Sequence, residues 1–353
     1  MTRIVIITDS LSNSIAASQI IAPLQQYHAD HPDQACLLIS FERTYNSELF
    51  QQIQDQIPFA KLIIKKRSPF LGTWSLWGAQ RTLQNLLKSY NYYHIVARGP
   101  LAGFLAIKSA TNACLSITIQ ARSLLAQEYL FAHPLTRWYH PRTWFDWVRF
   151  RQLHTIEQFV YGAHYRAAAP VTIQAVSHAL KHYLQRTYHT PATILTIAQE
   201  DIPTLIDINK VVDWRIQTRQ ELGIDQQATV YCYNGSIKPW QQPDSTITFF
   251  KQKLTQDATS VLLVLTHDID LFKEQLHAQQ INTTNYRIIN CEHSQVYRYL
   301  SVADFGIIFR EPHIVNWTAR PTKVLEYQAV GLPIIHNNTI AMLIEKDRCC
   351  SPK

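Results

Sequence analysis

Short apolar runs alternate with helix-like segments along the second half of the chain. The runs are rich in β-branched residues and lack polar alternation, which predicts strands buried on both faces. The segments between them place apolar residues at helical spacing. Together they indicate a parallel sheet covered on both faces, that is, a doubly wound α/β domain. The predicted strands are 229–233, 261–266, 286–290, 305–309 and 332–335, and the predicted helices are 245–254, 271–278, 295–301 and 322–329.

The first half opens with the same alternation. Aromatic and basic residues at mainly helical spacing interrupt it over 128–165, after which 171–176 is the last predicted strand of this half. A stretch with two prolines and several acidic residues, from Thr190 to Trp214, is the candidate hinge. The other predicted strands are 4–7, 35–40, 62–64, 94–97 and 115–118, and the predicted helices are 15–27 and 179–185.

The length of the chain supports two domains rather than one. A chain of 353 residues exceeds one ordinary compact core. We expect a Rossmann-like domain over 1–195, a hinge over 196–215 and a second Rossmann-like domain over 216–353. Parallel sheets of this kind bind ligands at the carboxyl ends of their strands. We therefore expect a ligand cleft between the two domains.

Composition limits the class of ligand that is expected and indicates the cellular compartment. The chain has only nine glycines, and it carries neither a Walker loop nor a dinucleotide fingerprint. Its net charge of +7 indicates an anionic partner. The six cysteines show no metal-binding spacing, and the first apolar run is too short for a signal sequence, so a cytoplasmic location is predicted. No apolar stretch approaches the roughly 20 residues that span a bilayer.

Residues 320–331 combine groups that suit a diphosphate. Pro321 fits the first position of a helix, because it has no N–H to leave unsatisfied. The N–H groups and the positive dipole end of that helix form an anion site, to which Thr322 and Lys323 add a hydroxyl and an ammonium. Glu326 lies one turn deeper on the same face and can accept hydrogen bonds from sugar hydroxyls. On spacing alone, a well-capped helix with a solvated lysine explains the segment equally well.

The segment Arg-Pro-Thr-Lys-Val-Leu-Glu-Tyr-Gln-Ala-Val-Gly resembles the signature of glycosyltransferase family 4 and its GT-B relatives. The resemblance implies the GT-B fold, in which two Rossmann-like domains face each other across a cleft. It also implies that Glu326 binds the donor ribose and that Thr322 and Lys323 lie near the phosphates. The segments 176–181, 219–224 and 296–304 resemble other elements of that family, in the same order along the chain.

A second segment, Asn-Gly-Ser-Ile-Lys-Pro-Trp-Gln at 234–241, follows the first strand of the second domain. It resembles the phosphate loop of the family. Gly235 would allow close approach of the ligand, and Ser236 and Lys238 would supply hydrogen-bond donors. The donor-binding residues implied by both segments are therefore Gly235, Ser236, Lys238, Thr322, Lys323 and Glu326.

Catalytic residues are less well defined, and the candidates are Arg98, Arg122 and Glu311. Residues 119–128 resemble an Asp-x-Arg-Gly…Glu pattern of polysaccharide-building relatives, in which Arg122 and Glu128 match. Arg98 follows the predicted strand 94–97, although an arginine at a strand end is also typical of a surface ion pair. The commonest family pattern has a second glutamate where this chain has Thr318, and Glu311 is the nearest acidic residue.

Two other kinds of site compete with this interpretation. Asp268 and Asp270 form an Asp-x-Asp sequence, which binds metal in the other large glycosyltransferase fold. Here it follows a strand of the second domain, so surface carboxylates explain it better and we expect no metal. His293 and His336 stand singly at strand ends, where structural histidines are usual.

Basic and aromatic residues gather in two segments of the first domain. Such clusters suit a membrane interface, and they also suit an ordinary domain surface with partly buried tryptophans. They lie outside any recognisable nucleic-acid motif, so we expect no nucleic-acid partner. The first segment holds Lys65, Lys66, Arg67, Phe70, Leu71, Trp74, Leu76 and Trp77, and the second Arg137, Trp138, Tyr139, Arg142, Trp144, Phe145, Trp147, Arg149 and Arg151.

The predicted function is transfer of a sugar from a nucleoside-diphosphate sugar to a hydroxyl of a glycan or a lipid-linked acceptor. The resemblance implies a retaining reaction in cell-envelope polysaccharide synthesis, on or near the inner face of the cytoplasmic membrane. The nucleotide sugar is a co-substrate, and we expect no cofactor. Two alternatives stay open: a nucleotide-sugar epimerase of the same fold, and a non-catalytic sugar-nucleotide-binding module. The short tail after the last strand, from Thr339 to Lys353, favours the second alternative or a truncated chain.

Overall fold

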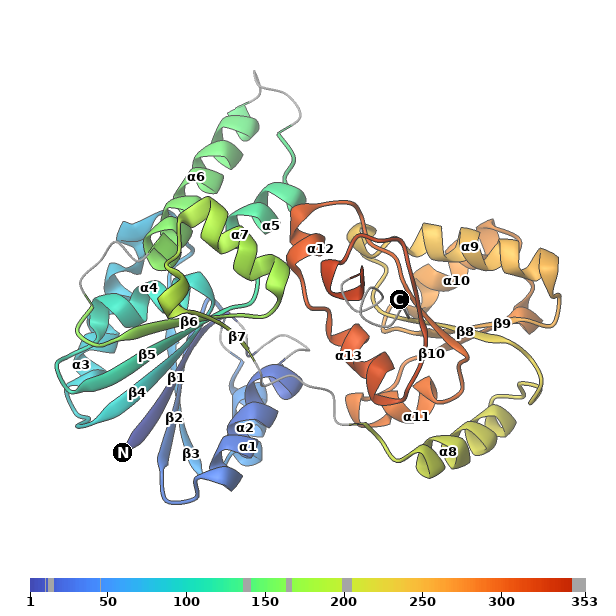
Figure 1. The fold of residues 1–353 in the computed structure, drawn as a ribbon, viewed down its shortest axis with the longest axis horizontal. Coiled ribbons are helices and arrows are strands. Elements are labelled where there is room, and N and C mark those ends of the chain that lie inside the picture. Colours follow the sequence, from blue (N-terminus) through green and yellow to red (C-terminus); the bar gives the residue numbers. More distant parts are fainter. Residues whose placement is uncertain are drawn as a thin grey trace. The chain divides into compact units, whose positions relative to one another are not determined.

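The computed structural model describes residues 1–9, 11, 16–44, 46–135, 141–162, 167–198 and 205–344. The chain forms two compact units, Met1–Glu200 and Asp201–Lys353. Each is an α/β unit built on a parallel sheet, as the alternation of apolar runs and helices predicted (Figure 1). The exact limits of the hinge at 196–215 stay a prediction.

Unit 1 holds a seven-stranded parallel sheet in the order β3-β2-β1-β4-β5-β6-β7. Both faces of its first strand are covered, because the adjacent Ile6 and Ile7 point to opposite faces and both are fully buried. The strand β7 was not predicted: it is a short edge strand that pairs with β6. The strands are β1 (Thr2–Thr8), β2 (Ala35–Glu42), β3 (Ala60–Lys66), β4 (Tyr93–Arg98), β5 (Cys114–Ala121), β6 (Val171–Ala175) and β7 (Leu195–Ile197).

Helices cover both faces of this sheet. Leu24 of α1 and Phe50 of α2 pack on Ile7 and Leu38 of the strands, forming one apolar layer. The helix α4 packs against β1, β4 and β5 and is itself almost completely buried. The predicted helix at 15–27 is a π-helical turn, η1 (Ala17–Ile21), followed by α1. The helices are α1 (Ala22–Asp30), α2 (Ser47–Gln56), α3 (Trp77–Leu87), α4 (Gly99–Ser109), α5 (Leu125–Ala132), α6 (Pro141–Gly162) and α7 (His178–Tyr188).

Unit 2 holds a five-stranded parallel sheet in the order β10-β9-β8-β11-β12. Val211 of α8 and Val324 of α13 share one apolar layer, and Phe250 of α9 and Phe272 of α10 share the other. The sheet is therefore doubly wound. The strands are β8 (Val230–Asn234), β9 (Val261–Leu265), β10 (Tyr286–Ile289), β11 (Phe305–Ile308) and β12 (Ile334–His336), and the helices are α8 (Ile208–Glu221), α9 (Pro243–Gln256), α10 (Ile269–Ala278), α11 (Val296–Leu300), α12 (Ile314–Thr318) and α13 (Thr322–Ala329).

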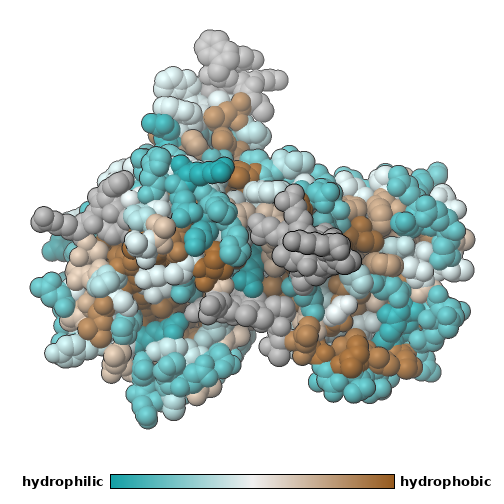
Figure 2. Space-filling model, viewed as in Figure 1, coloured by the Kyte–Doolittle hydropathy of each residue, from teal (hydrophilic) through white to brown (hydrophobic). Residues whose placement is uncertain are grey.

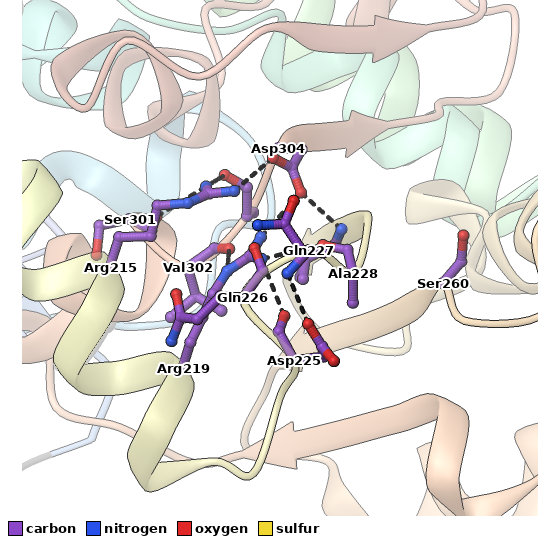
Figure 3. Close-up of polar contacts among 12 residues, drawn as sticks. Arg215, Arg219, Asp225, Gln226, Gln227, Ala228, Ser260, Ser301, Val302 and Asp304 are labelled. Carbon is purple, nitrogen blue, oxygen red and sulfur yellow. Dashed lines mark hydrogen bonds and ion pairs between the residues drawn. The ribbon is translucent and has the colours of Figure 1, made fainter.

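A buried arginine fixes α8 to the amino ends of the strands (Figure 3). The Arg219 side chain is fully buried, and its guanidinium donates to the carbonyl groups of Val302 and Ala228 at 3.0 Å. It also donates to the Asp304 carboxylate at 2.9 Å. Arg215 and the backbone N–H of Val230 donate to the same carboxylate. The family-like segments 219–224 and 296–304 thus meet in a structural cluster at the end of the sheet where strands β8 and β11 begin.

The surface of the described residues carries two apolar features. The solvent side of α8 exposes Ile208, Val212 and Ile216, which Figure 2 shows as a brown patch. The first half of α6 exposes aromatic side chains, with Trp144 at 65% and Phe145 at 59% of full accessibility. Among the described residues, no helix combines the length and the apolarity needed to cross a bilayer.

Candidate functional site

The strand order of unit 2 reverses between β8 and β11. In open α/β sheets, ligands bind at the carboxyl ends of the strands beside such a reversal, where the loops diverge. Asn234 and Gly235 leave β8 at this point, and Phe309 and Arg310 leave β11. The phosphate-loop segment predicted at 234–241 therefore starts at the position where the topology favours a ligand.

Lys323, in the first turn of α13, reaches the 234–241 loop. Its ammonium donates a hydrogen bond to the side-chain oxygen of Gln241 at 2.5 Å and lies 5.9 Å from the centre of the Tyr233 ring. It also lies directly over Gly235, where a Cβ atom would collide with the ammonium and with Gln241. Gly235 is thus needed for close approach, although the group that approaches it in this structure is the lysine.

The carboxylate of Glu326 faces the end of β8. The side-chain amide of Asn234 donates to it at 2.6 Å. One residue further along α13, the Tyr327 hydroxyl accepts from the Asn234 N–H at 3.1 Å and donates to the Cys232 carbonyl at 3.2 Å. Gly306 of β11 makes room for this ring, because a Cβ there would lie 2.6 Å from it. These contacts fix the turn of α13 that presents Glu326.

The site concentrates positive charge in a desolvated place. Burial and, to a smaller extent, the nearby Arg310 together lower the pKa of Lys323 to about 7, whereas Glu326 opposes both effects. Burial also lowers the pKa of Arg310. Two cations held near each other out of water favour an anion between them. The arrangement can therefore bind a phosphate or diphosphate group.

Asp268 positions the 234–241 loop. Its carboxylate accepts a hydrogen bond from the Ile237 N–H at 2.9 Å, and its own N–H donates to Thr266 at 3.0 Å. Asp270 lies in the first turn of α10. Among the described residues, no group of three acidic, histidine or cysteine side chains is placed to hold a metal ion. The hydrogen bond to Ile237 supplies a structural reason for the first aspartate of the Asp-x-Asp sequence.

The other residues predicted to bind the donor are Ser236, Lys238 and Thr322, and they differ in their contacts with the network around Lys323. The Ser236 hydroxyl accepts a hydrogen bond from Gln241 at 2.8 Å, so it belongs to the same network. Lys238 is exposed, with its ammonium 5.2 Å from the centre of the Trp240 ring. Thr322 is the first residue of α13. Pro321 was predicted to be the first helical residue, but it is the N-cap that precedes the helix.

The structure explains why position 318, where the family pattern has a second glutamate, does not carry an acidic residue in this chain. Thr318 is buried at the end of α12, and its hydroxyl donates to the Ile314 carbonyl at 2.9 Å. A glutamate at this position would bury a charged carboxylate in a packed helix end, which is unfavourable without a partner. Glu311 is exposed in the loop between β11 and α12, where its carbonyl accepts a hydrogen bond from Asn316 at 2.8 Å. The structure does not bring Glu311 into contact with the network around Lys323.

The two arginine candidates lie in unit 1, at the carboxyl ends of adjacent strands. Arg98 follows β4 and donates to the backbone carbonyl and the side chain of Gln19 on η1. Arg122 follows β5 and donates to the Gln120 side chain at 3.3 Å. Glu128, which matched the same family pattern as Arg122, is half-buried on α5, and this burial raises its pKa. Catalytic roles for these residues stay predictions.

The sequence interpretation missed three residues of the unit 2 site. Gln241 and Asn234 lie within the quoted loop, but amide side chains carry no charge signal. Arg310 follows a predicted strand, and its position after β11, beside the switch point, was the available clue.

The structure exposes only some of the side chains in the two basic and aromatic segments. Trp74, Trp77 and Trp147 are exposed, at 69%, 63% and 46%. Phe70 and Leu76 are buried and do not contribute to a surface. Arg137, Trp138 and Tyr139 lie outside the described residues.

This chain is similar in fold to several proteins of known structure. No protein-family model matches the chain, and no curated protein matches it in sequence. WaaG, a glycosyltransferase of lipopolysaccharide biosynthesis, is 14% identical with a TM-score of 0.62, covering 99% of this chain and 85% of WaaG. Sucrose-phosphate synthase from Thermosynechococcus elongatus is 12% identical with a TM-score of 0.61, covering 98% and 83%. A Listeria monocytogenes protein assigned as a UDP-N-acetylglucosamine 2-epimerase is 11% identical with a TM-score of 0.53, covering 94% and 78%.

These similarities extend over nearly the whole chain. They confirm the predicted fold class: two parallel-sheet α/β domains of the GT-B glycosyltransferase type. At such low identity they establish the fold and leave the reaction to be argued from the site.

Proposed function

We propose that this protein is a glycosyltransferase that takes a sugar from a nucleoside-diphosphate sugar. The observation that carries the proposal is the meeting of the 234–241 loop with the first turn of α13, where Lys323 contacts Gln241 over Gly235. The loop and the helix lie at the switch point of a sheet whose fold is that of glycosyltransferases. A diphosphate would displace Gln241 from the Lys323 ammonium and take its place.

The same groups would stabilise the departing diphosphate. When the glycosidic bond to the donor breaks, negative charge develops on the leaving oxygen. Lys323, Arg310 and the N–H groups at the start of α13 would stabilise this charge, and donors held in place by the fold need little reorganisation during a reaction. Glu326, one turn deeper, would accept hydrogen bonds from the donor ribose. We propose that this set works without a metal ion and that the transfer is retaining.

The acceptor is proposed to be a hydroxyl of a glycan or of a lipid-linked sugar in cell-envelope polysaccharide synthesis. WaaG, one of the proteins of similar fold, is a glycosyltransferase involved in lipopolysaccharide biosynthesis. The exposed aromatic residues Trp144, Phe145 and Trp147 on α6 would rest among the headgroups at the cytoplasmic face of a membrane, with Arg151 near anionic lipid. A flotation assay with phosphatidylglycerol vesicles tests this, and a Trp144→Ser, Trp147→Ser variant that floats as well as the native protein would contradict it.

The donor proposal is tested by nucleotide binding. A thermal-shift panel of UDP, GDP, ADP, CMP and dTDP should identify one diphosphate that stabilises the protein, since a ligand bound to the native state raises its melting temperature. Lys323→Ala and Glu326→Ala should each lower the affinity for that nucleotide while leaving the fold intact. Lys273→Ala, on the exposed side of α10, is the matched control. Unchanged affinity in both site variants would refute the donor site.

An epimerase is the second candidate, because the Listeria protein assigned to that activity shares the fold. Incubation with the donor alone separates the two reactions, since an epimerase changes the sugar without an acceptor. A third candidate is a non-catalytic binding module, which the buried Thr318 at the upstream acidic position favours. Nucleotide binding without transfer, hydrolysis or epimerisation of the donor would support it.

A further inference from the structure

Charged residues follow three adjacent strands of unit 1. Asp9 follows β1, Arg43 comes directly after β2, and Arg67 comes directly after β3. The Asp9 carboxylate lies 3.3 Å from Nε of Arg43 and also pairs with the Arg67 guanidinium. It accepts the Arg43 N–H at 2.9 Å as well. One carboxylate thus holds two guanidinium groups at the carboxyl end of the sheet, where ligands bind in this class of fold.

The helix α6 adds a third guanidinium to this place. Arg149 lies with its guanidinium 5.2 Å from the centre of the Phe70 ring, in the loop that follows β3. Burial lowers the pKa of Arg67, and the positive charge of Arg149 lowers it further. Burial is also the main cause that lowers the pKa of Arg149, with Arg43 adding to it. We call Arg43, Arg67 and Arg149 the arginine cluster.

Two donors of the arginine cluster are buried and unused. The Arg67 side chain is only 5% exposed, and within the described part of the chain its Nε has no hydrogen-bond partner. The Nη1 atom of Arg149 is likewise buried without a partner there. A charged donor kept from water and left unsatisfied is costly, and native proteins seldom retain one without a reason. Arg43, with 58% of its side chain exposed, gives the cluster an open side.

Two further carboxylates belong to the elements that carry the arginine cluster. Asp146 on α6 accepts the Tyr129 hydroxyl at 2.7 Å. Glu42, at the end of β2, accepts the Ser40 hydroxyl at 2.5 Å and the Leu11 N–H at 3.3 Å. The Asp9 carboxylate pairs with two of the three guanidinium groups, and within the described part of the chain the Arg67 Nε and the Arg149 Nη1 keep no partner. Buried guanidinium donors in this state favour an anion that accepts their hydrogen bonds.

We propose that the arginine cluster binds a phosphoryl group of a ligand of unit 1. Guanidinium groups present paired N–H donors that match phosphate oxygens, and three of them converging from β2, β3 and α6 can surround one phosphate. The unused Nε of Arg67 and Nη1 of Arg149 are the donors that it would satisfy. The residues of this site all belong to unit 1, and the site is inferred independently of the proposed donor site of unit 2. If the proposed transfer holds, the phosphoryl group belongs to the second substrate.

Equilibrium dialysis of the full chain with radiolabelled pyrophosphate tests this. The probe should fill two sites, one in each unit. Arg43→Gln with Arg149→Gln should remove one site or weaken it at least tenfold, and Lys323→Gln should affect only the other. Arg186→Gln, an exposed arginine of α7, is the charge-matched control. Arg149→Lys, which keeps the charge and the fold but not the paired donors, should weaken the unit 1 site several-fold.

The outcomes separate the two proposals. Pyrophosphate binding that persists in Lys323→Gln and disappears in the arginine double variant supports the arginine cluster alone. Binding unchanged in the folded double variant and in Arg149→Lys overturns the cluster, whatever happens at Lys323. Glucuronate that competes as well as glucose 6-phosphate would overturn the phosphoryl assignment. Phosphatidic acid vesicles that displace the probe more effectively than glucose 6-phosphate would assign the phosphoryl group to a lipid.

Discussion

The ammonium of Lys323 donates a hydrogen bond to the side chain of Gln241, so the start of α13 is tied to the loop that leaves β8. The two residues are far apart in sequence, and their contact lies directly over Gly235. Gln241 in turn donates to Ser236, which makes the loop and the helix one polar network. Any anion that enters must exchange with this network, and this requirement gives the first two predictions.

Nucleoside diphosphate binding should weaken as the pH rises above 7. Burial holds the pKa of Lys323 at about 7, so the free protein loses this charge above that pH. A bound diphosphate restores the charge, and binding must then take up a proton. We expect the dissociation constant to rise up to about tenfold per pH unit between pH 7 and 9. Calorimetry in two buffers with different ionisation enthalpies measures the uptake, and Lys323→Gln should abolish it. An equal affinity at pH 7 and pH 9 would contradict the prediction.

Gly235→Ala should lower the affinity for a nucleoside diphosphate by about tenfold, or about 1.4 kcal/mol. The new methyl group would occupy the place of the Lys323 ammonium and of the Gln241 oxygen, and the lysine would be pushed away. The control is Gly78→Ala in α3, where a Cβ meets nothing within 4 Å. Calorimetric titration of the two variants gives the comparison. Similar affinities in both would show that Lys323 can move without consequence.

Asp304→Ala should destabilise unit 2 strongly. The change leaves the fully buried Arg219 guanidinium without its carboxylate, and breaking such a pair costs about 3–5 kcal/mol. Asp213→Ala, an exposed aspartate on α8, removes the same charge and should cost little. Urea unfolding monitored by circular dichroism measures both. A shift in Asp304→Ala no larger than in Asp213→Ala would assign the stability of α8 to its apolar contacts alone.

The stability of unit 1 should fall between pH 5 and pH 8. Burial raises the pKa of Glu157 from 4.5 to about 7, although hydrogen bonds from Tyr188 and from the Ala126 N–H oppose the rise. The folded state therefore holds this proton more tightly than the unfolded chain. The stabilisation is fully present below pH 4.5 and lost as the pH passes 7, by up to about 3 kcal/mol.

Glu157→Gln should remove most of this pH dependence, because the amide stays neutral at every pH in the range. Melting temperatures measured from pH 5 to pH 8 provide the test. Glu48→Gln, an exposed glutamate of α2, serves as the control and should keep the native slope. A native slope retained in Glu157→Gln would place the titration on Glu128, whose pKa burial also raises.

All the strands except β7 were predictable because each contains a short run rich in apolar and β-branched residues. The alternation of those runs with helices predicted the fold class. The edge strand β7 was missed, since a strand of three residues is too short to show a period of two. The placement of Lys323 and Glu326 on one face of α13 was predictable from charge and helix position, and their role in donor binding stays a prediction. The site was not predictable where it rests on amides such as Gln241, whose role depends on contacts between distant segments.

The buried Arg219 cluster and the Lys323 network lie at opposite ends of the same strands. The buried ion-pair cluster holds the ends at which β8 and β11 begin, and the proposed donor site lies at the ends where they stop. Loops at the carboxyl edge can therefore accept insertions and substitutions with little penalty in folding. If the proposed transfer holds, the loops after β8 and β11 could be exchanged to alter the sugar preference, provided that Arg219 and Asp304 are kept.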